Sequence, residues 1–402
     1  MRRLIFCWNY LEWGGAQIYF LGIMKLARQN WDVTVLLPRG SDPKLLGFLD
    51  EESIAYEFLD VTALLGTAST ISEKFRRHLS HIRSWIEIAK RVGAHELSKS
   101  ILHIEVAPWH AVWFLMFLSL RRANVFITLH NALPEVSPIR RFIWRYKLAI
   151  FSRLRGMHIF TSNEDAKARF RPWVTEKFWN TIKVTYTTVN PAEIARATDN
   201  TEPQNILRSK FDLDPTKFTV LCLGQFIDRK GRWVFLEAAR LASKSAADIQ
   251  FVWLTASPVA GEDIDLIETY GLGERFHLIQ AGRVGHKRQD ILEFYRLADV
   301  YALPSFVEGL PIALLEAMAM GVASISTDVY AIPEALMNEK TGLLVRAGNA
   351  EQLAKAIVRL KNNDGLRREL AGAGREFVLE HFDERAASQI AIDAYGECLA
   401  NV

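Results

Sequence analysis

Short apolar runs alternate with stretches of helical periodicity along almost the whole chain, and this alternation limits the folds that the chain can adopt. The apolar runs are nearly continuous, and most are rich in β-branched or aromatic residues, as in strands buried on both faces. Helical stretches such as 17–29 and 72–92 lie between them. We expect strands at 4–8, 32–37, 101–106, 125–129, 158–161, 183–187, 219–223, 250–255, 277–280, 300–303, 323–326 and 342–345. This order predicts an α/β fold of doubly wound parallel sheets with helices on both faces.

The number of domains follows from the length of the chain and from one break in the alternation. A chain of 402 residues is too long for one ordinary core. The polar segment 190–205 contains two prolines and interrupts the pattern. We therefore expect a Rossmann-like domain over 1–190, a linker over 191–205, a second Rossmann-like domain over 206–380, and a C-terminal helix over 381–402 that packs back on the first domain. Ligands of such sheets bind beyond the carboxyl ends of the strands, so we expect the site in a cleft between the domains.

Composition excludes several classes of partner and location. A net charge of +3 gives no reason to expect a nucleic-acid partner. The three cysteines, Cys7, Cys222 and Cys398, are far apart and match no metal-binding spacing, which favours a reducing compartment. The first residues lack the core of a signal peptide. The longest apolar stretch, 111–120, is about half of the roughly 20 residues that a membrane-spanning helix needs. We expect a cytoplasmic protein without a transmembrane helix.

The first strand of each half is followed by a loop with candidate ligand-binding residues. Gly14 and Gly15 lie between a strand and a helix, where backbone amides can approach an anion closely. A glycine pair can equally form an ordinary tight turn. In the second half, Arg229 and Lys230 precede Gly231 and an apolar helix. At the carboxyl end of a strand this cation pair could hold a diphosphate, and the alternative is a solvated surface.

A third loop has the sequence PSFVEGLPIALLEAMAMG at residues 304–321. Proline is favoured at the first position of a helix, so Pro311 is expected to begin one and to leave nearby amides free for a phosphate or sugar oxygen. Carboxylates accept hydrogen bonds from sugar hydroxyls, so Glu308 could bind a hexose hydroxyl and Glu316 the two hydroxyls of a ribose. The alternative is a helix cap and one partly buried glutamate, although burying a carboxylate without partners is costly.

Glu308 and Glu316, in the context EGLPIALLEAMAMG, match the Glu-x7-Glu motif of glycosyltransferase family 4. The chain resembles this family, a retaining group with the GT-B fold, in which two Rossmann-like domains face a central cleft. The pair Gly14-Gly15, the run Arg229-Lys230-Gly231 and the segment TDVYAIPEAL…TGLLV at 327–345 support the resemblance. It covers nearly the whole chain, more closely in the second half.

The resemblance implies transfer of a sugar, with retention, from a nucleotide diphosphate sugar to a hydroxyl of a glycan, a polysaccharide or a lipid-linked saccharide. It implies neither a metal nor another cofactor. The resemblance implies Gly15 near the distal phosphate or sugar, Arg229 and Lys230 at the diphosphate, and Glu308 with Gly309, Leu310 and Pro311 at the sugar. It implies Glu316 at the ribose and Arg283 and Val284 at the base. Gly14 and Gly224 are also expected to bind the donor.

One further histidine completes the expected site. His130, in TLHNALP, matches a histidine that the family places near the donor sugar, and the alternative is an ordinary loop histidine. The expected catalytic residues are therefore His130, Arg229, Lys230 and Glu308. Two alternatives remain open. One is an enzyme, a nucleotide-sugar epimerase, and the other is a two-lobed sugar-nucleotide binding protein without activity. The pairs Asp212/Asp214 and Asp263/Asp265 are expected to be solvated surface, and no metal site is expected.

The segment 121–156 concentrates positive charge. Its eight basic residues are Arg121, Arg122, Arg140, Arg141, Arg145, Lys147, Arg153 and Arg155. Glu135 is its one acidic residue, so the segment carries +7 while the rest of the chain carries −4. Aromatic residues are interleaved with these cations, as in helices that lie at a membrane interface. Two interpretations remain, a core-packed helix with a basic outer face and a contact of 140–155 with anionic lipid at the inner face of the membrane.

Overall fold

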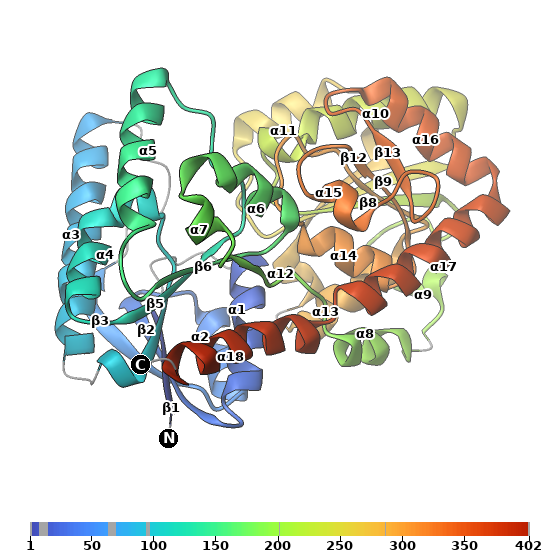
Figure 1. Ribbon diagram of the computed structural model, residues 1–402. Helices are drawn as coiled ribbons and strands as arrows, with labels where there is room; N and C mark the ends of the chain where they lie inside the picture. Colours follow the sequence, from blue (N-terminus) through green and yellow to red (C-terminus); the bar gives the residue numbers. More distant parts are fainter. Residues whose placement is uncertain are drawn as a thin grey trace. The chain divides into compact units, whose positions relative to one another are not determined.

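The chain divides into two compact α/β units, each built on its own parallel sheet. The computed structural model describes residues 2–7, 15–62, 70–93, 97–200, 202–285 and 287–400. Unit 1 comprises Met1–Tyr186 together with Arg385–Val402, and unit 2 comprises Thr187–Glu384. The main chain is drawn in Figure 1. None of the helices in the described ranges has the length and apolar character needed to cross a bilayer.

Unit 1 contains a seven-stranded parallel sheet in the order β3-β2-β1-β4-β5-β6-β7. Its strands are β1 (Arg2–Cys7), β2 (Trp31–Arg39), β3 (Ala55–Thr62), β4 (Ser100–Ile104), β5 (Asn124–Leu129), β6 (Met157–Thr161) and β7 (Lys183–Val184). Its helices are α1 (Gly15–Ala27), α2 (Pro43–Glu51), α3 (Ile71–Gly93), α4 (Pro108–Leu120), α5 (Pro138–Phe151), α6 (Glu164–Phe170), α7 (Glu176–Trp179) and most of α18 (Glu384–Ala400). Short 3₁₀ turns lie at Leu97–Lys99 and Arg171–Trp173.

The two faces of this sheet are covered by different helices. Successive side chains of a strand point to opposite faces. Leu4 and Phe6 of β1 pack in a core with α1, α2 and α18, whereas Ile5 and Cys7 pack in a core with α3, α4 and α5. Unit 1 therefore has two apolar layers, and helices α3, α4 and α5 (blue to green in Figure 1) share one of them.

The last helix supplies part of the core of unit 1. Tyr395 of α18 is fully buried, and its hydroxyl lies 2.5 Å from Nδ1 of His103 on β4. The ring of Tyr395 also contacts Phe126 of β5 and Trp31 of β2. One face of the sheet is thus closed by a segment that follows the whole of unit 2 in the sequence.

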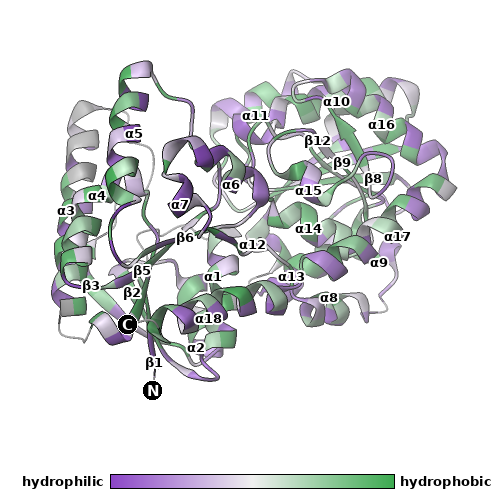
Figure 2. Ribbon diagram, in the orientation of Figure 1, coloured by the Kyte–Doolittle hydropathy of each residue, from purple (hydrophilic) through white to green (hydrophobic). Residues whose placement is uncertain are grey.

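Unit 2 contains a six-stranded parallel sheet in the order β10-β9-β8-β11-β12-β13. Its strands are β8 (Phe218–Leu223), β9 (Ile249–Thr255), β10 (Phe276–Gln280), β11 (Val300–Leu303), β12 (Ala323–Thr327) and β13 (Leu343–Val345). Its helices are α8 (Pro191–Thr198), α9 (Gln204–Ser209), α10 (Arg232–Ser245), α11 (Gly261–Glu268), α12 (Ala281–Val284), α13 (Arg288–Phe294), α14 (Ile312–Ala319), α15 (Ile332–Ala335), α16 (Ala350–Asn362) and α17 (Asp364–His381), with 3₁₀ turns at Asp228–Lys230, Gly273–Arg275 and Tyr295–Leu297. Figure 2 shows hydrophobic strands β8 and β9 beside helices of mixed character such as α10 and α17.

The sequence patterns predicted this class of fold, and two details differ. Each expected strand has a counterpart, and β3 at the edge of the first sheet was not expected. The segment 191–205, expected to be an irregular linker, carries α8 and the start of α9 within unit 2. Its Asn190 caps α8, because the side chain accepts hydrogen bonds from the amides of Ala192 and Glu193, and Pro191 follows at the first helical turn.

Candidate functional site

Two of the three loops selected from the sequence lie at one edge of the sheet of unit 2. Strands β8 and β11 are neighbours, with Val220 paired to Val300 and Leu221 to Tyr301. In a parallel sheet, the loops that follow neighbouring strands leave at the same edge. The loop with Arg229 and Lys230 and the loop with Glu308 therefore start side by side.

Gly231 allows these two loops to touch. Its φ of +74° lies in the left-handed region, and a Cβ atom at this position would lie 2.0 Å from the carbonyl oxygen of Pro304. Only glycine fits such a close approach of two backbones. The amide of Phe306 also donates a hydrogen bond to the carbonyl oxygen of Arg229 at 2.9 Å. The local sequence thus fixes the distance between the cation pair and the second loop.

Lys230, Arg229 and Glu308 form a charged cluster at this contact. The Lys230 ammonium donates to Oε1 of Glu308 at 2.5 Å, and Ser305 Oγ donates to the same oxygen at 2.7 Å. Nη1 of Arg229 donates to the carbonyl oxygen of Val307 at 3.0 Å and lies 3.6 Å from Oε2 of Glu308. The side chains of Lys230 and Glu308 are 14% and 6% exposed, whereas that of Arg229 is 44% exposed. The cluster carries one excess positive charge, and its guanidinium is open to an anionic ligand.

Gly224 and the residues after Glu308 complete the surroundings of this cluster. Gly224 has a φ of +153°, and a Cβ atom added to it would lie 3.6 Å from Cε of Lys230. The carbonyl oxygen of Gly224 accepts a hydrogen bond from Nε1 of Trp253. Pro311 is the cap of α14 rather than its first helical residue, because its ψ of 118° is extended. Leu310 and Pro311 are buried and Gly309 is half-buried.

Glu316 lies inside α14 and is held by protein partners that were not expected. Nη2 of Arg288 lies 2.7 Å from Oε1 of Glu316, and the hydroxyl of Tyr295 donates to Oε2 at 3.0 Å. Nε of the same arginine donates to Glu193 at 2.5 Å. The three ionic side chains are between 4% and 13% exposed. The cost of burying Glu316 is therefore offset within the protein, which weakens burial alone as an argument for a ligand role.

The surroundings of Arg288 and Tyr295 raise the pKa of both side chains. Burial acts to lower the pKa of Arg288, but the carboxylates of Glu316 and Glu193 outweigh it and hold this pKa above its ordinary value. Burial and the adjacent Glu316 keep the pKa of Tyr295 well above its ordinary range, so its hydroxyl remains a donor. Arg288 and Glu193 carry no local signal in the sequence, because their contact joins segments 95 positions apart.

Three of the expected site residues, Gly14, Gly15 and His130, fall in the sequence range of unit 1. Gly15 is the first residue of α1, and Gly14 lies outside the described residues. His130 follows β5, and its ring packs edge-on against Tyr19 and Phe20. Burial lowers the pKa of His130 to about 4, so its imidazole is neutral near pH 7. Its Nε2 atom is buried and has no hydrogen-bond partner within the described parts of the chain, so it retains the capacity to bind a polar group.

The two residues expected near the base are placed in α12 after β10. Arg283 forms an ion pair with Asp212, and both side chains are mostly exposed. Val284 is half-buried. Asp212 was expected to be solvated surface, as was Asp263, and Asp263 instead pairs with Arg232 at 2.7 Å. Within the ranges that the structure describes, no group of three or more His, Cys, Asp or Glu side chains could hold a metal ion.

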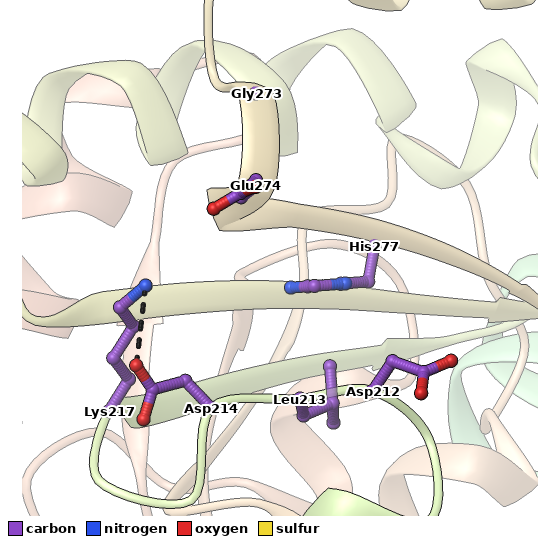
Figure 3. Close-up of a pocket in the computed structure, with 7 residues that line it drawn as sticks. All are labelled: Asp212, Leu213, Asp214, Lys217, Gly273, Glu274 and His277. Atoms are coloured by element: carbon purple, nitrogen blue, oxygen red, sulfur yellow. Dashed lines mark ion pairs between the residues drawn. The ribbon is translucent and has the colours of Figure 1, made fainter.

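A separate hollow of about 620 Å³ occurs in unit 2 and is shown in Figure 3. Its lining residues are Asp212, Leu213, Asp214, Lys217, Gly273, Glu274 and His277. Lys217 directly precedes β8 and pairs with Asp214, and Glu274 precedes β10. The hollow therefore lies at the amino ends of these strands, at the opposite edge of the sheet from Lys230. Parallel sheets bind their ligands at the carboxyl edge, so we assign no donor site to it.

One family model matches the part of the chain that contains this site. Residues 203–377, which include the Lys230–Glu308 cluster and Glu316, match the family model of the glycosyl transferases group 1. This match covers less than half of the chain. The loops at the carboxyl edge of the sheet of unit 2 lie within the matched segment.

Curated relatives match parts of the chain. The phosphatidyl-myo-inositol mannosyltransferase of Mycobacterium leprae is 33% identical over 174 residues, which are 43% of this chain and 45% of the relative. An N,N'-diacetylbacillosaminyl-diphospho-undecaprenol α-1,3-N-acetylgalactosaminyltransferase of Campylobacter jejuni is 34% identical over 115 residues, 29% of this chain and 30% of the relative. The chain spans about half or less of the length of the curated relatives that it matches.

The solved structures establish the fold over the whole chain. Anabaena HepE in complex with UDP-glucose has a TM-score of 0.76 at 16% identity, with 100% of both chains covered. A glycosyltransferase of Rickettsia africae has a TM-score of 0.75 at 18% identity and covers 100% of this chain and 99% of its own. The fold is therefore GT-B, with two Rossmann-like units.

Proposed function

We propose that this protein transfers a sugar from a nucleotide diphosphate sugar to an acceptor hydroxyl, with retention of the anomeric configuration. The observation that carries the proposal is the Lys230–Glu308 cluster, in which two cations and a carboxylate meet at the carboxyl edge of the sheet of unit 2. The group 1 family match and the HepE complex with UDP-glucose support it. Retention rests on the resemblance of the Glu308-x7-Glu316 motif to the retaining family.

In this proposal the cation pair stabilises the leaving group. Breaking the anomeric bond leaves negative charge on the nucleoside diphosphate. The amino end of α14 offers an anion at most about 2 kcal/mol, whereas enzymes lower barriers by roughly 8–23 kcal/mol. The ammonium of Lys230 and the exposed guanidinium of Arg229 therefore carry much of the charge stabilisation. Because these cations already supply positive charge, we propose that the reaction needs no metal and that EDTA leaves the activity unchanged.

The carboxylates are proposed to orient the donor through its hydroxyl groups. Oε2 of Glu308 is 3.6 Å from Arg229 and makes no closer contact with it, so this oxygen can accept from a hexose hydroxyl. The carboxylate of Glu316, which Arg288 and Tyr295 hold in place, is proposed to accept from the two hydroxyls of the ribose. The neutral His130, with its unpartnered Nε2, is proposed to bind a hydroxyl of the transferred sugar. Arg283 and Val284 are proposed to frame the base, and Gly14 and Gly15 to approach the distal phosphate or sugar.

The acceptor is proposed to be a saccharide or a lipid-linked saccharide. The names of several relatives specify such acceptors or pathways, including an undecaprenol-linked saccharide and colanic acid biosynthesis. A cytoplasmic location, with access to the inner face of the membrane, would bring the enzyme to such acceptors.

The test begins with a thermal-shift screen of nucleotide sugars, because a bound donor raises the melting temperature. With the donor found, Lys230→Ala is expected to lower kcat by about 10²–10³-fold, and Glu316→Gln to raise the donor KM chiefly. Arg359→Ala is the control, because Arg359 lies on α16 and its exposed ion pair with Glu339 involves neither loop. Near-normal kinetics of Lys230→Ala would overturn the assignment.

The same assay separates the two alternatives. A transferase consumes donor in proportion to acceptor and yields a product whose anomeric proton couplings show retention. Interconversion of the donor without any acceptor would identify an epimerase. A stabilising donor with no turnover under any acceptor would identify a binding protein.

A further inference from the structure

Helix α5 of unit 1 carries two apolar stripes, one buried in the core and one exposed. Trp144, Leu148 and Phe151 are buried in the core that covers one face of the sheet. On the other side, Ile139, Phe142, Ile143 and Tyr146 are between 44% and 75% exposed. At about 100° per residue the exposed stripe spans about 100° of the helix and lies roughly opposite the buried one. A core-packed helix needs the first stripe only.

Positive charge lies on both flanks of the exposed stripe. By the same helical geometry, Arg140 and Lys147 fall on one side of it, and Arg141 and Arg145 on the other. None of the eight basic residues of 121–156 forms an ion pair with a carboxylate among the residues that the structure describes. An apolar stripe with cations along both edges is the pattern of a helix that lies in the plane of a membrane interface.

The neighbouring helix α4 adds a second exposed apolar stripe in the same layer. Trp113, Phe117 and Leu120 are 61%, 44% and 78% exposed, and their spacing of four and three residues places them on one side of the helix. Helices α4 and α5 pack against each other, with the rings of Trp109 and Trp144 5.2 Å apart. Both helices bury their opposite sides in one core, so both exposed stripes point away from the same face of the sheet.

We propose that this outer surface of α4 and α5 docks on an anionic lipid bilayer. The aromatic and aliphatic side chains enter the boundary between headgroups and acyl chains, and the flanking arginines and Lys147 pair with lipid phosphates. Charge complementarity selects this occupant, since the segment carries +7 in a chain whose remainder carries −4. The surface shares no residue with the Lys230–Glu308 cluster, so docking does not depend on the proposed reaction.

The test is co-sedimentation of the full chain with vesicles of phosphatidylcholine alone and with vesicles that also contain phosphatidylglycerol. Binding is expected with the anionic vesicles and is expected to weaken as salt is added. Two variants separate the two contributions. The double variant Ile139→Ser/Phe142→Ser removes apolar contact with the lipid. The triple variant Arg140→Glu/Arg141→Glu/Arg145→Glu reverses the charge. Each variant is expected to lower the partition coefficient by about tenfold or more. Ile264→Ser on α11 is the matched control, because this exposed isoleucine lies in unit 2.

A second readout reports the depth of insertion. Lipids with brominated acyl chains are expected to quench part of the tryptophan fluorescence, and Trp113→Phe is expected to lose that part. Equal binding to neutral and anionic vesicles, or no binding to either, would overturn the proposal. Concentration-dependent dimerisation that Ile139→Ser/Phe142→Ser abolishes, without vesicle binding, would instead assign the surface to a second copy of this chain.

Discussion

Replacement of Arg288 by methionine tests how far the ionic triad of unit 2 determines its stability. Arg288 bridges Glu193 and Glu316 at 2.5 and 2.7 Å, and all three side chains are nearly buried. The substitution Arg288→Met would leave two buried carboxylates without their counter-charge. Removing one partner of a buried ionic group costs about 3–5 kcal/mol, a large part of the roughly 5–15 kcal/mol that stabilises a typical domain.

The assay is differential scanning calorimetry of the full chain, which resolves the transitions of the two units if they unfold separately. For a unit of this size, about 2–4 °C of melting temperature is lost per kcal/mol, so the transition of unit 2 should fall by about 6–20 °C. The control is Arg359→Met, which breaks an exposed pair with Glu339 that is worth about 0–1 kcal/mol. The triple variant Arg288→Met/Glu193→Met/Glu316→Met should recover much of the loss, because no unpaired charge remains. If Arg288→Met costs no more than Arg359→Met, the triad does not stabilise the unit and the reasoning fails.

Two other predictions concern the backbone and acid stability. Gly231→Ala should lower the free energy of unfolding of unit 2 in urea by clearly more than Gly271→Ala. Both glycines have positive φ, but only at Gly231 would a Cβ atom lie on a backbone oxygen. Equal losses of unfolding free energy would contradict the close approach. Unit 1 should lose stability as the pH falls below about 6.5, since burial lowers the pKa of His103 to about 3 and those of His130 and His158 to about 4. The histidines of the unfolded chain bind protons at higher pH than those of the folded unit, so each histidine lowers the free energy of unfolding by about 1.4 kcal/mol per pH unit. A free energy of unfolding of unit 1 in urea that is unchanged between neutral pH and about pH 5 would refute this.

The strands were largely predictable because most of them are buried on both faces and are therefore visible as apolar runs. The exception, β3 (Ala55–Thr62), is an edge strand in which exposed and buried residues alternate, and its Glu57 and Asp60 hide the pattern. Segment 190–205 was interpreted as a linker for a different reason. An asparagine followed by a proline signals a loop, yet the same two residues also cap and begin a helix, as they do in α8.

The candidate site was predictable where it depends on neighbours in the sequence. Gly231, the cation pair and Glu308 all follow strands, and the parallel topology of β8 and β11 brings them together. The partners of Glu316 could not be found in this way, since Arg288 lies on another helix and Glu193 in a segment interpreted as a linker. Long-range ionic contacts leave no periodic signal, so sequence reasoning recognised the buried carboxylate but not what neutralises it.

The contribution of α18 to unit 1 has a consequence for the order of folding during synthesis. Tyr395 fills the core beside His103 and Phe126, but the ribosome makes it only after every residue of unit 2. Domains commonly fold as they emerge, the N-terminal one first. Unit 1 therefore lacks part of its apolar layer until α18 is synthesised, whereas every residue of unit 2 is already present at that stage.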